Sequence, residues 1–198
     1  MAFKIAVLLL MPYCFWLLFY TDAYVESITG KVLGMNLESV LISLNYLVNI
    51  PTQWVHEAGH GVCYFFPCPQ FLAALNGTIF QLLLPAAFIV YYRREGNAVL
   101  QGVSWFWLGQ TLTYVAWYMS TAQTPNKYPS LIPYANVHDF WFIFSQMGLL
   151  EYNGLFAGSV RFIAIVILLG SYGYLLHLAF FKNNAKEKAL PDRRGKEN

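Results

Sequence analysis

The stretch that decides the fold is residues 71–92, FLAALNGTIFQLLLPAAFIVYY, which carries no charged residue and is followed at once by Arg93 and Arg94. A helix of about 20 apolar residues is long enough to cross the hydrocarbon core of a bilayer. Basic residues directly after such a run mark its cytoplasmic end. The sequence therefore predicts a transmembrane helix over 71–92 whose C-terminal end faces the cytoplasm.

Charge is scarce in the rest of the chain as well. Only 11% of the 198 residues are charged and 58% are apolar, whereas ordinary soluble domains carry about 25% charged residues. Nine charges lie in residues 182–198 and only eight lie in 39–181. This distribution excludes a water-soluble globule, a disordered chain and a nucleic-acid binder. We expect an all-α polytopic membrane protein with one domain, 1–181, and a basic cytoplasmic tail, 182–198.

Three other runs are candidates for membrane spans. Residues 98–120 form one uncharged run, and a last apolar run extends from about 155 to 181. Residues 5–20 follow Lys4 and resemble the core of a signal peptide, but we expect them to form a slightly short span. Because positive charge favours the cytoplasmic side, we place the C-terminal tail inside and expect the N-terminus to be inside too.

Two segments do not fit simple crossings. Residues 137–150 are too few to span the membrane. They lie between the run 98–120, which leads out of the cytoplasm, and the run 155–181, which leads back. We therefore expect a re-entrant or interfacial helix there. Within the apolar stretch 39–66, Pro51 favours a short lead-in followed by a helix that begins near Thr52, and whether this stretch crosses or returns stays open. The bundle thus has about four to six membrane segments, of which one or two are re-entrant or short.

A metal-binding pattern, His56-Glu57-Ala58-Gly59-His60, lies on that predicted helix. Residues four apart share a helix face, so both imidazoles can bind one Zn²⁺ while Glu57 lies beside the open position. A carboxylate there can take a proton from an attacking water and later give it to a leaving amine. Ionisable groups inside an apolar helix are costly, and metal ligation offsets that cost. The pattern predicts a zinc site with Glu57 as its catalytic residue.

A third protein ligand must come from elsewhere, and the embedded region offers few. We favour Asp139, because a carboxylate partly neutralises the dication in a low dielectric. The adjacent His138 could be a ligand instead, or could orient one. Glu151 is the third choice, with Arg161 as its expected ion-pair partner. His177 lies near the cytoplasmic end of its span, where we expect it to face the headgroups.

The remaining polar and sulfur-containing residues are expected to be structural. Cys14, Cys63 and Cys68 are too few for a disulfide framework; Cys63 and Cys68 could pair or bind metal, but we expect small buried free thiols. Asn76-Gly77-Thr78 fits a helix-start turn better than a glycosylation site. Gln81, in its apolar run, is expected to hydrogen-bond between helices.

Two resemblances bear on function. HEAGH within a membrane segment, followed by a later aspartate, resembles the site-2 protease family of intramembrane zinc metalloproteases, although the family's Asn-Pro and Leu-Asp-Gly context is replaced here by residues 136–140, NVHDF. Over residues 55–152 the chain is more similar to an uncharacterised family of bacterial membrane proteins. That family shares the order of these motifs: HEAGH, Asn76-Gly77-Thr78 with Gln81 and Pro85, Trp107-Leu108-Gly109-Gln110, His138-Asp139 and Gly148-Leu149-Leu150-Glu151-Tyr152. The first resemblance implies His56, His60 and Asp139 as ligands and Glu57 as general base; the second implies a bacterial inner membrane location.

Two functions follow as hypotheses. The first is a zinc metalloprotease that hydrolyses a peptide bond in or near the bilayer, with a membrane protein or peptide as substrate. The alternative is a non-catalytic structural or accessory subunit of a larger membrane complex, with a structural or vestigial metal site, because the chain shows no obvious substrate-selecting domain. Membrane di-iron hydroxylases also use paired histidines, but they need more than the four present here. We expect lipid and membrane-protein partners and no nucleic acid.

Overall fold

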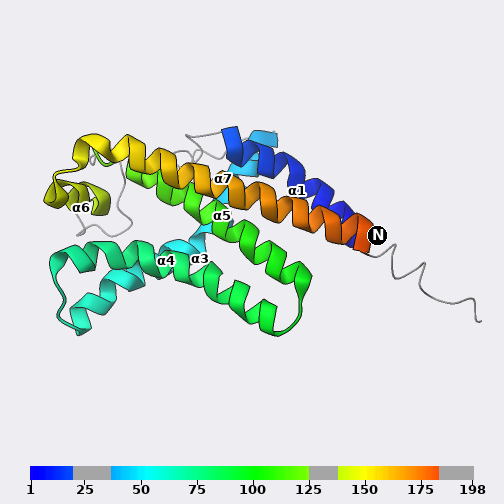
Figure 1. Ribbon diagram of the computed structural model, residues 1–198, viewed down its shortest axis with the longest axis horizontal. Helices are drawn as coiled ribbons and strands as arrows, with labels where there is room; N and C mark the ends of the chain where they lie inside the picture. The colour runs from blue at the N-terminus through cyan, green and yellow to red at the C-terminus, as the bar shows by residue number, and fades with distance from the viewer. Residues whose placement is uncertain (20–36, 125–137, 183–198) are drawn as a thin grey trace, which may run out of the picture.

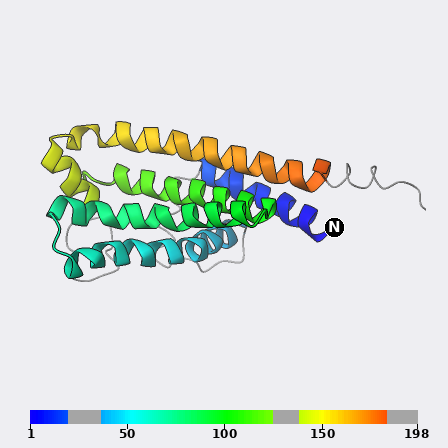
Figure 2. The same cartoon turned by 60° about the horizontal axis from the view of Figure 1, so that its bottom comes forward.

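A computed structural model describes residues 1–19, 37–124 and 138–182, so the basic tail lies almost wholly outside the described residues. Within these ranges every regular element is helical, which confirms the all-α prediction. The elements are α1 (Ala2–Phe19), α3 (Leu37–Phe65), α4 (Gln70–Arg94), α5 (Ala98–Ser120), α6 (Asp139–Met147), the 3₁₀ turn η2 (Leu150–Tyr152), α7 (Asn153–His177) and the π-helical turn η3 (Leu178–Lys182). Helices α4, α5 and α7 run along the long axis, and α6 lies at one end (Figures 1 and 2).

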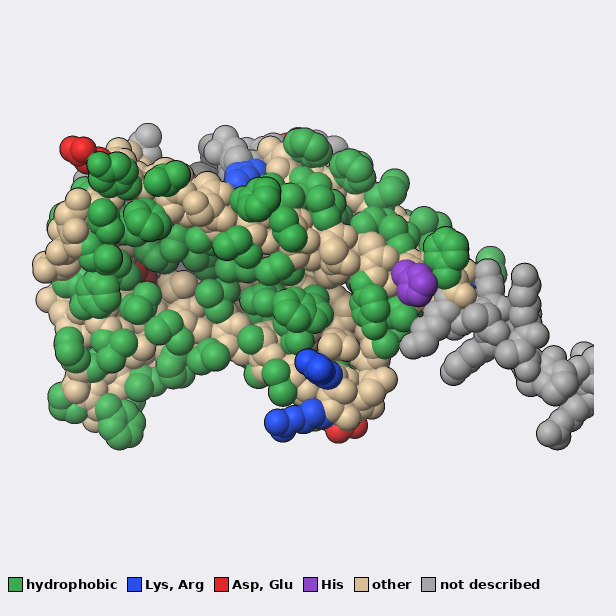
Figure 3. Space-filling model, viewed as in Figure 1, with side chains coloured by type: hydrophobic (Ala, Val, Ile, Leu, Met, Phe, Trp, Pro, Cys, Tyr) green, Lys and Arg blue, Asp and Glu red, His purple; other side chains and the backbone are tan. Residues whose placement is uncertain are grey.

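Three of the described helical segments are long and apolar enough to cross a membrane: α1, α4 and the segment Leu150–Phe181 that contains α7. Each corresponds to a run that the sequence predicts as a span. Large apolar side chains on α7 point outward, with Leu155 and Phe162 exposed by 68% and 69%. The face of the molecule in Figure 3 is mostly hydrophobic. Such a continuous apolar surface suits contact with lipid better than contact with water.

Helix α5 is not among these three candidates, although the sequence predicts a span there. It is the central helix of the bundle and packs against both α4 and α7. Its polar residues Gln110 and Thr111 are 1% and 0% exposed, and the Gln110 amide donates to Asn45 Oδ1 over 3.1 Å. Because these side chains face protein, they lower the hydropathy of α5 without contacting lipid. The crossing by α5 stays a prediction.

Helix α3 differs from its predicted form, because no break precedes Thr52. The helix continues through Pro51, which is exposed, so the missing N–H lies on the outer side of the helix. In the same turn the Thr52 hydroxyl donates to the Asn49 carbonyl over 2.8 Å.

The short helix predicted within 137–150 is confirmed as α6, of nine residues; residue 137 itself lies outside the described ranges. Gly148 ends it in the left-handed conformation, with φ of 68°, which glycine adopts at little cost. After η2, the Asn153 amide donates to the carbonyls of Met119 and Ser120 over 3.2 and 3.0 Å. These two hydrogen bonds fix the start of α7 against the end of α5. They therefore place α6 beside that end.

The expectation of free thiols at Cys63 and Cys68 is wrong, because the two form a disulfide. The chain reverses between α3 and α4, and this turn brings the two Cα atoms to 5.5 Å, within the usual range for a disulfide. Cys14 is free and buried, as expected. The bond thus closes the turn directly after the helix that carries His56 and His60.

The packing of α5 on α7 predicts a strong effect of Gly109→Ala. An added Cβ would lie 2.8 Å from Leu168 Cγ and 3.1 Å from the Leu168 backbone nitrogen, so a side-chain rotation alone cannot relieve the clash. We expect a loss of about 1–3 kcal/mol of stability, measured by unfolding in detergent. Gly170→Ala on α7 is the control, since its Cβ would meet no atom within 4 Å. Equal stability of the two variants would contradict this packing.

Candidate metal centre

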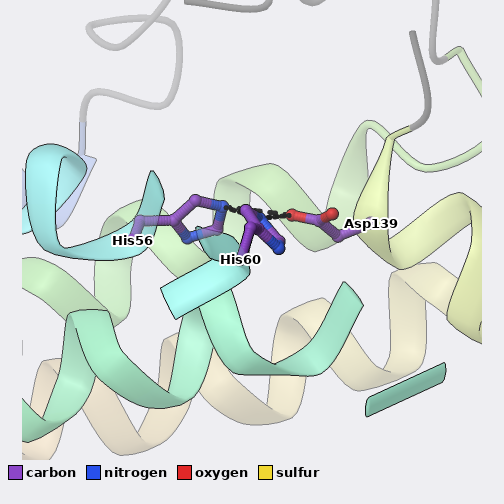
Figure 4. A group of neighbouring side chains, drawn as sticks. All are labelled: His56, His60 and Asp139. Carbon is purple, nitrogen blue, oxygen red and sulfur yellow. Dashed lines mark hydrogen bonds and ion pairs between the residues drawn. The ribbon is translucent and has the colours of Figure 1, made fainter. Parts of the chain in front are cut away.

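Three side chains that can bind metal converge near the end of the bundle: His56 and His60 from α3, and Asp139, the first residue of α6 (Figure 4). The two Nε2 atoms are 3.1 Å apart. Asp139 Oδ2 lies 3.1 Å from His56 Nε2 and 3.3 Å from His60 Nε2. His56 and Asp139 are buried and His60 is half-buried. The structure therefore brings together the three residues that the sequence favours as ligands.

The other ring nitrogen of each histidine is held by an oxygen acceptor. His60 Nδ1 donates to the Ala73 carbonyl over 2.7 Å, and His56 Nδ1 donates to Gln81 Oε1 over 3.1 Å. Since a carbonyl oxygen can only accept, each Nδ1 carries a proton and each ring turns its Nε2 toward the other two ligand atoms. Metal-binding histidines are commonly oriented in this way. Gln81, predicted to bond between helices, does so at the site.

The spacing of the three ligand atoms fits a metal ion. In a tetrahedral zinc site with bonds of about 2.0–2.1 Å, neighbouring ligand atoms are about 3.3 Å apart. The observed separations of 3.1, 3.1 and 3.3 Å differ from that value by at most a few tenths of an ångström. A cation held between these atoms would bind the lone pairs of both rings and the negative charge of the Asp139 carboxylate. The buried group could therefore hold a metal ion with little rearrangement.

Two glycines allow α3 and α4 to approach closely at this point. A Cβ on Gly77 of α4 would lie 2.7 Å from His60 Cε1 and 2.8 Å from His56 Cε1. A Cβ on Gly59 of α3 would lie 2.5 Å from the Asn76 carbonyl oxygen. Asn76 and Gly77 lie inside α4, which begins at Gln70, so their interpretation as a helix-start turn is wrong. Small residues there provide the room for the two imidazoles.

Tyr118 contacts the metal-binding group and is not among the site residues predicted from the sequence. Its hydroxyl donates to Asp139 Oδ2 over 3.3 Å and accepts from the Asp139 backbone N–H over 3.2 Å. Its ring meets the edge of the His56 ring at a centroid distance of 6.1 Å. Tyr118 thus orients the carboxylate, but nothing in the sequence distinguishes it from the many other aromatic residues of the spans.

His138 is placed beside the group and not in it. Its Nδ1 accepts from the Trp141 backbone N–H over 3.2 Å, which caps the start of α6. Its Nε2 lies 3.0 Å from the Thr121 hydroxyl, and its ring packs on Tyr118 with centroids 4.1 Å apart. Of the two adjacent candidates, the structure therefore directs Asp139 toward the imidazoles and His138 toward the backbone and Thr121.

The remaining candidate ligands lie apart from the site. Glu151 is exposed on η2. Arg161 donates instead to the Leu18 carbonyl over 3.2 Å, and the expected ion pair between Glu151 and Arg161 is not formed among the described residues. His177 is exposed near the end of α7 and stacks on Phe181, as expected of a residue outside the site.

Glu57 follows His56 on α3 and is partly exposed. Its carboxylate makes no hydrogen bond to the described part of the chain, so it remains available to exchange a proton with a bound molecule. This is the property that a general base requires.

A stripe of buried and partly buried polar side chains continues from the site along α3. Asn45, Asn49 and Gln53 follow one another at four-residue spacing before His56. The side-chain atoms Asn45 Nδ2, Asn49 Oδ1 and Gln53 Nε2, and Gln81 Nε2 and Thr78 Oγ1 on α4, are buried with no hydrogen-bond partner among the described residues. Buried polar atoms of this kind are usually satisfied by bound water. The stripe is therefore a place where water can be held next to the metal-binding group.

Comparison with known proteins identifies no relative of this chain. No protein-family model matches the chain, and neither the curated proteins nor the solved structures searched contain a match. The two resemblances drawn from the motifs stay predictions.

The close approach at Gly77 predicts that Gly77→Ala removes metal binding. Its Cβ would occupy the space of the two imidazole Cε1 atoms, so at least one ring has to leave the site. We expect the metal bound per purified protein to fall at least tenfold, measured by mass spectrometry of the metal. The control is Gly61→Ala on α3, whose Cβ would meet no atom within 4 Å. Full metal content in Gly77→Ala would show that these rings do not bind it.

Proposed function

We propose that this protein is a membrane-embedded zinc metallopeptidase that hydrolyses a peptide bond in or near the bilayer. The observation that carries the proposal is the convergence of His56 Nε2, His60 Nε2 and Asp139 Oδ2, with Glu57 at the next position of the same helix. Two imidazoles and a carboxylate are a donor set that suits zinc and leaves a fourth position open. The three apolar helices support a membrane location, which we propose to be a bacterial inner membrane.

The chain's own residues account for the proton transfers of hydrolysis. A bound zinc ion would supply the Lewis acid that polarises the substrate carbonyl and acidifies the attacking water. Glu57 takes a proton from that water as the water oxygen bonds to the carbonyl carbon. Glu57 then gives this proton to the peptide nitrogen as the C–N bond breaks, so that one carboxyl and one amine product leave. Tyr118 and Gln81 keep Asp139 and His56 in position throughout.

The number of ligands favours catalysis over a purely structural metal. Structural zinc sites are closed by four protein ligands, whereas catalytic sites use three. In the described parts of the chain the group contains three metal-binding side chains, and His138 and Glu151 do not join it. A fourth position is thus left for water or substrate. This distinguishes the proposal from the alternative of an accessory subunit with a structural or vestigial site.

Glu57→Gln should separate metal binding from hydrolysis. The amide has nearly the same shape but cannot accept the proton, so we expect unchanged metal content and a fall in peptide cleavage of about 10²–10⁴-fold. Both are measured on protein reconstituted in liposomes with a membrane-spanning peptide substrate. Glu151→Gln, at an exposed position away from the site, is the control and should cleave normally. Cleavage by Glu57→Gln at the parent rate would rule out the proposed role of Glu57.

A further inference from the structure

We infer that the metal-binding group opens toward the non-cytoplasmic face of the membrane, and that its substrate is a polypeptide segment at that outer boundary. The substrate part of this inference rests on the proposed hydrolytic function, whereas the sidedness does not. Three features of the structure support it: the end at which basic residues gather, the depth of the site along α4, and the position of the disulfide.

The cytoplasmic end of the bundle is marked by positive charge. Helix α4 ends at Arg93 and Arg94, and η3 ends at Lys182, where the basic tail begins. The N-terminus lies at the same end, because Lys4 Nζ sits 5.5 Å from the centroid of the Phe180 ring. Both ribbon views show the start of α1 and the end of the last helix together, opposite α6 (Figures 1 and 2). The positive-inside rule assigns this end to the cytoplasm.

The metal-binding group lies far from that end. Gln81 and Ala73, which accept hydrogen bonds from His56 and His60, both belong to α4. At 1.5 Å per residue they lie about 20 Å and about 31 Å along the helix from Arg94. Since the hydrocarbon core is about 30 Å thick, the group occupies its outer third and reaches the outer boundary. The partly exposed His60 and Glu57 are consistent with access from that side.

The Cys63–Cys68 disulfide indicates the same side independently of charge. It closes the turn between α3 and α4, less than one helical turn beyond His60. The Asn76 amide donates to Cys63 Sγ over 3.1 Å, which joins this turn to the helix that carries Gly77. Disulfides persist in oxidising compartments and are rare in the cytosol. A disulfide next to His60 therefore places this end of the site on the outer side of the membrane.

The three features together define the substrate class. Asp139 and α6 approach His56 and His60 from the outer end, and a peptide reaching Glu57 from there has to lie at the outer surface of the membrane. The account therefore favours the outer juxtamembrane segment of an anchored or exported protein. A segment on the cytoplasmic side would be separated from Glu57 by the inner half of the bundle, where α5 packs so closely on α7 that a Cβ on Gly102 would lie 2.8 Å from Leu175 Cδ2.

Sidedness can be tested in cells with the full-length protein and without any cleavage assay. Glu151→Cys, exposed on η2 beside α6, and Glu95→Cys, exposed at the turn after α4, form a matched pair at opposite ends. A membrane-impermeant maleimide should label Glu151→Cys in intact spheroplasts, and Glu95→Cys only after permeabilisation. The parent protein is the background control, since Cys14 is buried and the other two cysteines are paired. The reverse labelling pattern would overturn the inference.

The substrate class is tested with two single-span reporter proteins that carry the same target segment on the outer or the inner side. We expect the active protein to cleave at least tenfold more of the outer reporter, and the Glu57→Gln protein to cleave neither. Preferential cleavage of the inner reporter would overturn the substrate assignment. Outer labelling of Glu151→Cys with no cleavage of either reporter would instead count against the hydrolytic function and leave the sidedness in place.

Discussion

The contact of one buried carboxylate with the Nε2 atoms of two imidazoles is the constraint on which the rest of the structure depends. Asp139 is 8% exposed and His56 is 5% exposed, and each Nδ1–H is already directed to another acceptor. A buried anion without a positive partner costs several kcal/mol. A divalent cation between the three atoms would supply that positive partner. The need for positive charge is thus built into the packing and does not depend on any resemblance.

Several features of the fold serve to bring the three ligands together. Gly59 and Gly77 let α3 and α4 approach closely, and the disulfide closes the turn that joins them. On the other side, Asn153 holds the start of α7 against the end of α5, which places α6 within reach of α3. Ligands that come from helices joined in this way are held with little freedom, as a precise metal site requires.

Much of this arrangement could be predicted from local patterns. Apolar runs identify α1, α4 and α7, because a membrane span depends only on length and hydropathy. The spacing of His56 and His60 identifies two ligands, since residues four apart share a helix face. The third ligand, Asp139, can be inferred by elimination, because so few charged residues lie inside the body of the chain.

The rest depends on tertiary contacts that no local pattern contains. Tyr118 matters only because the α5 terminus meets α6, and Gly77 only because two rings from α3 lie against it. The pairing of Cys63 with Cys68 requires the exact reversal of the chain after α3. A proline usually ends a helix, but Pro51 faces outward and the helix continues through it. In each case the neighbouring element, and not the residue itself, decides the outcome.

The central claim is that His56, His60 and Asp139 bind one zinc ion and leave a position open. X-ray absorption at the zinc edge of the purified protein tests it most directly. The account predicts one zinc per chain with two imidazole nitrogens and two oxygens at about 2.0–2.1 Å, and loss of one imidazole contribution or of the metal in His56→Ala. Protein purified without chelators that contains no stoichiometric metal, or a zinc with sulfur ligands, would contradict it.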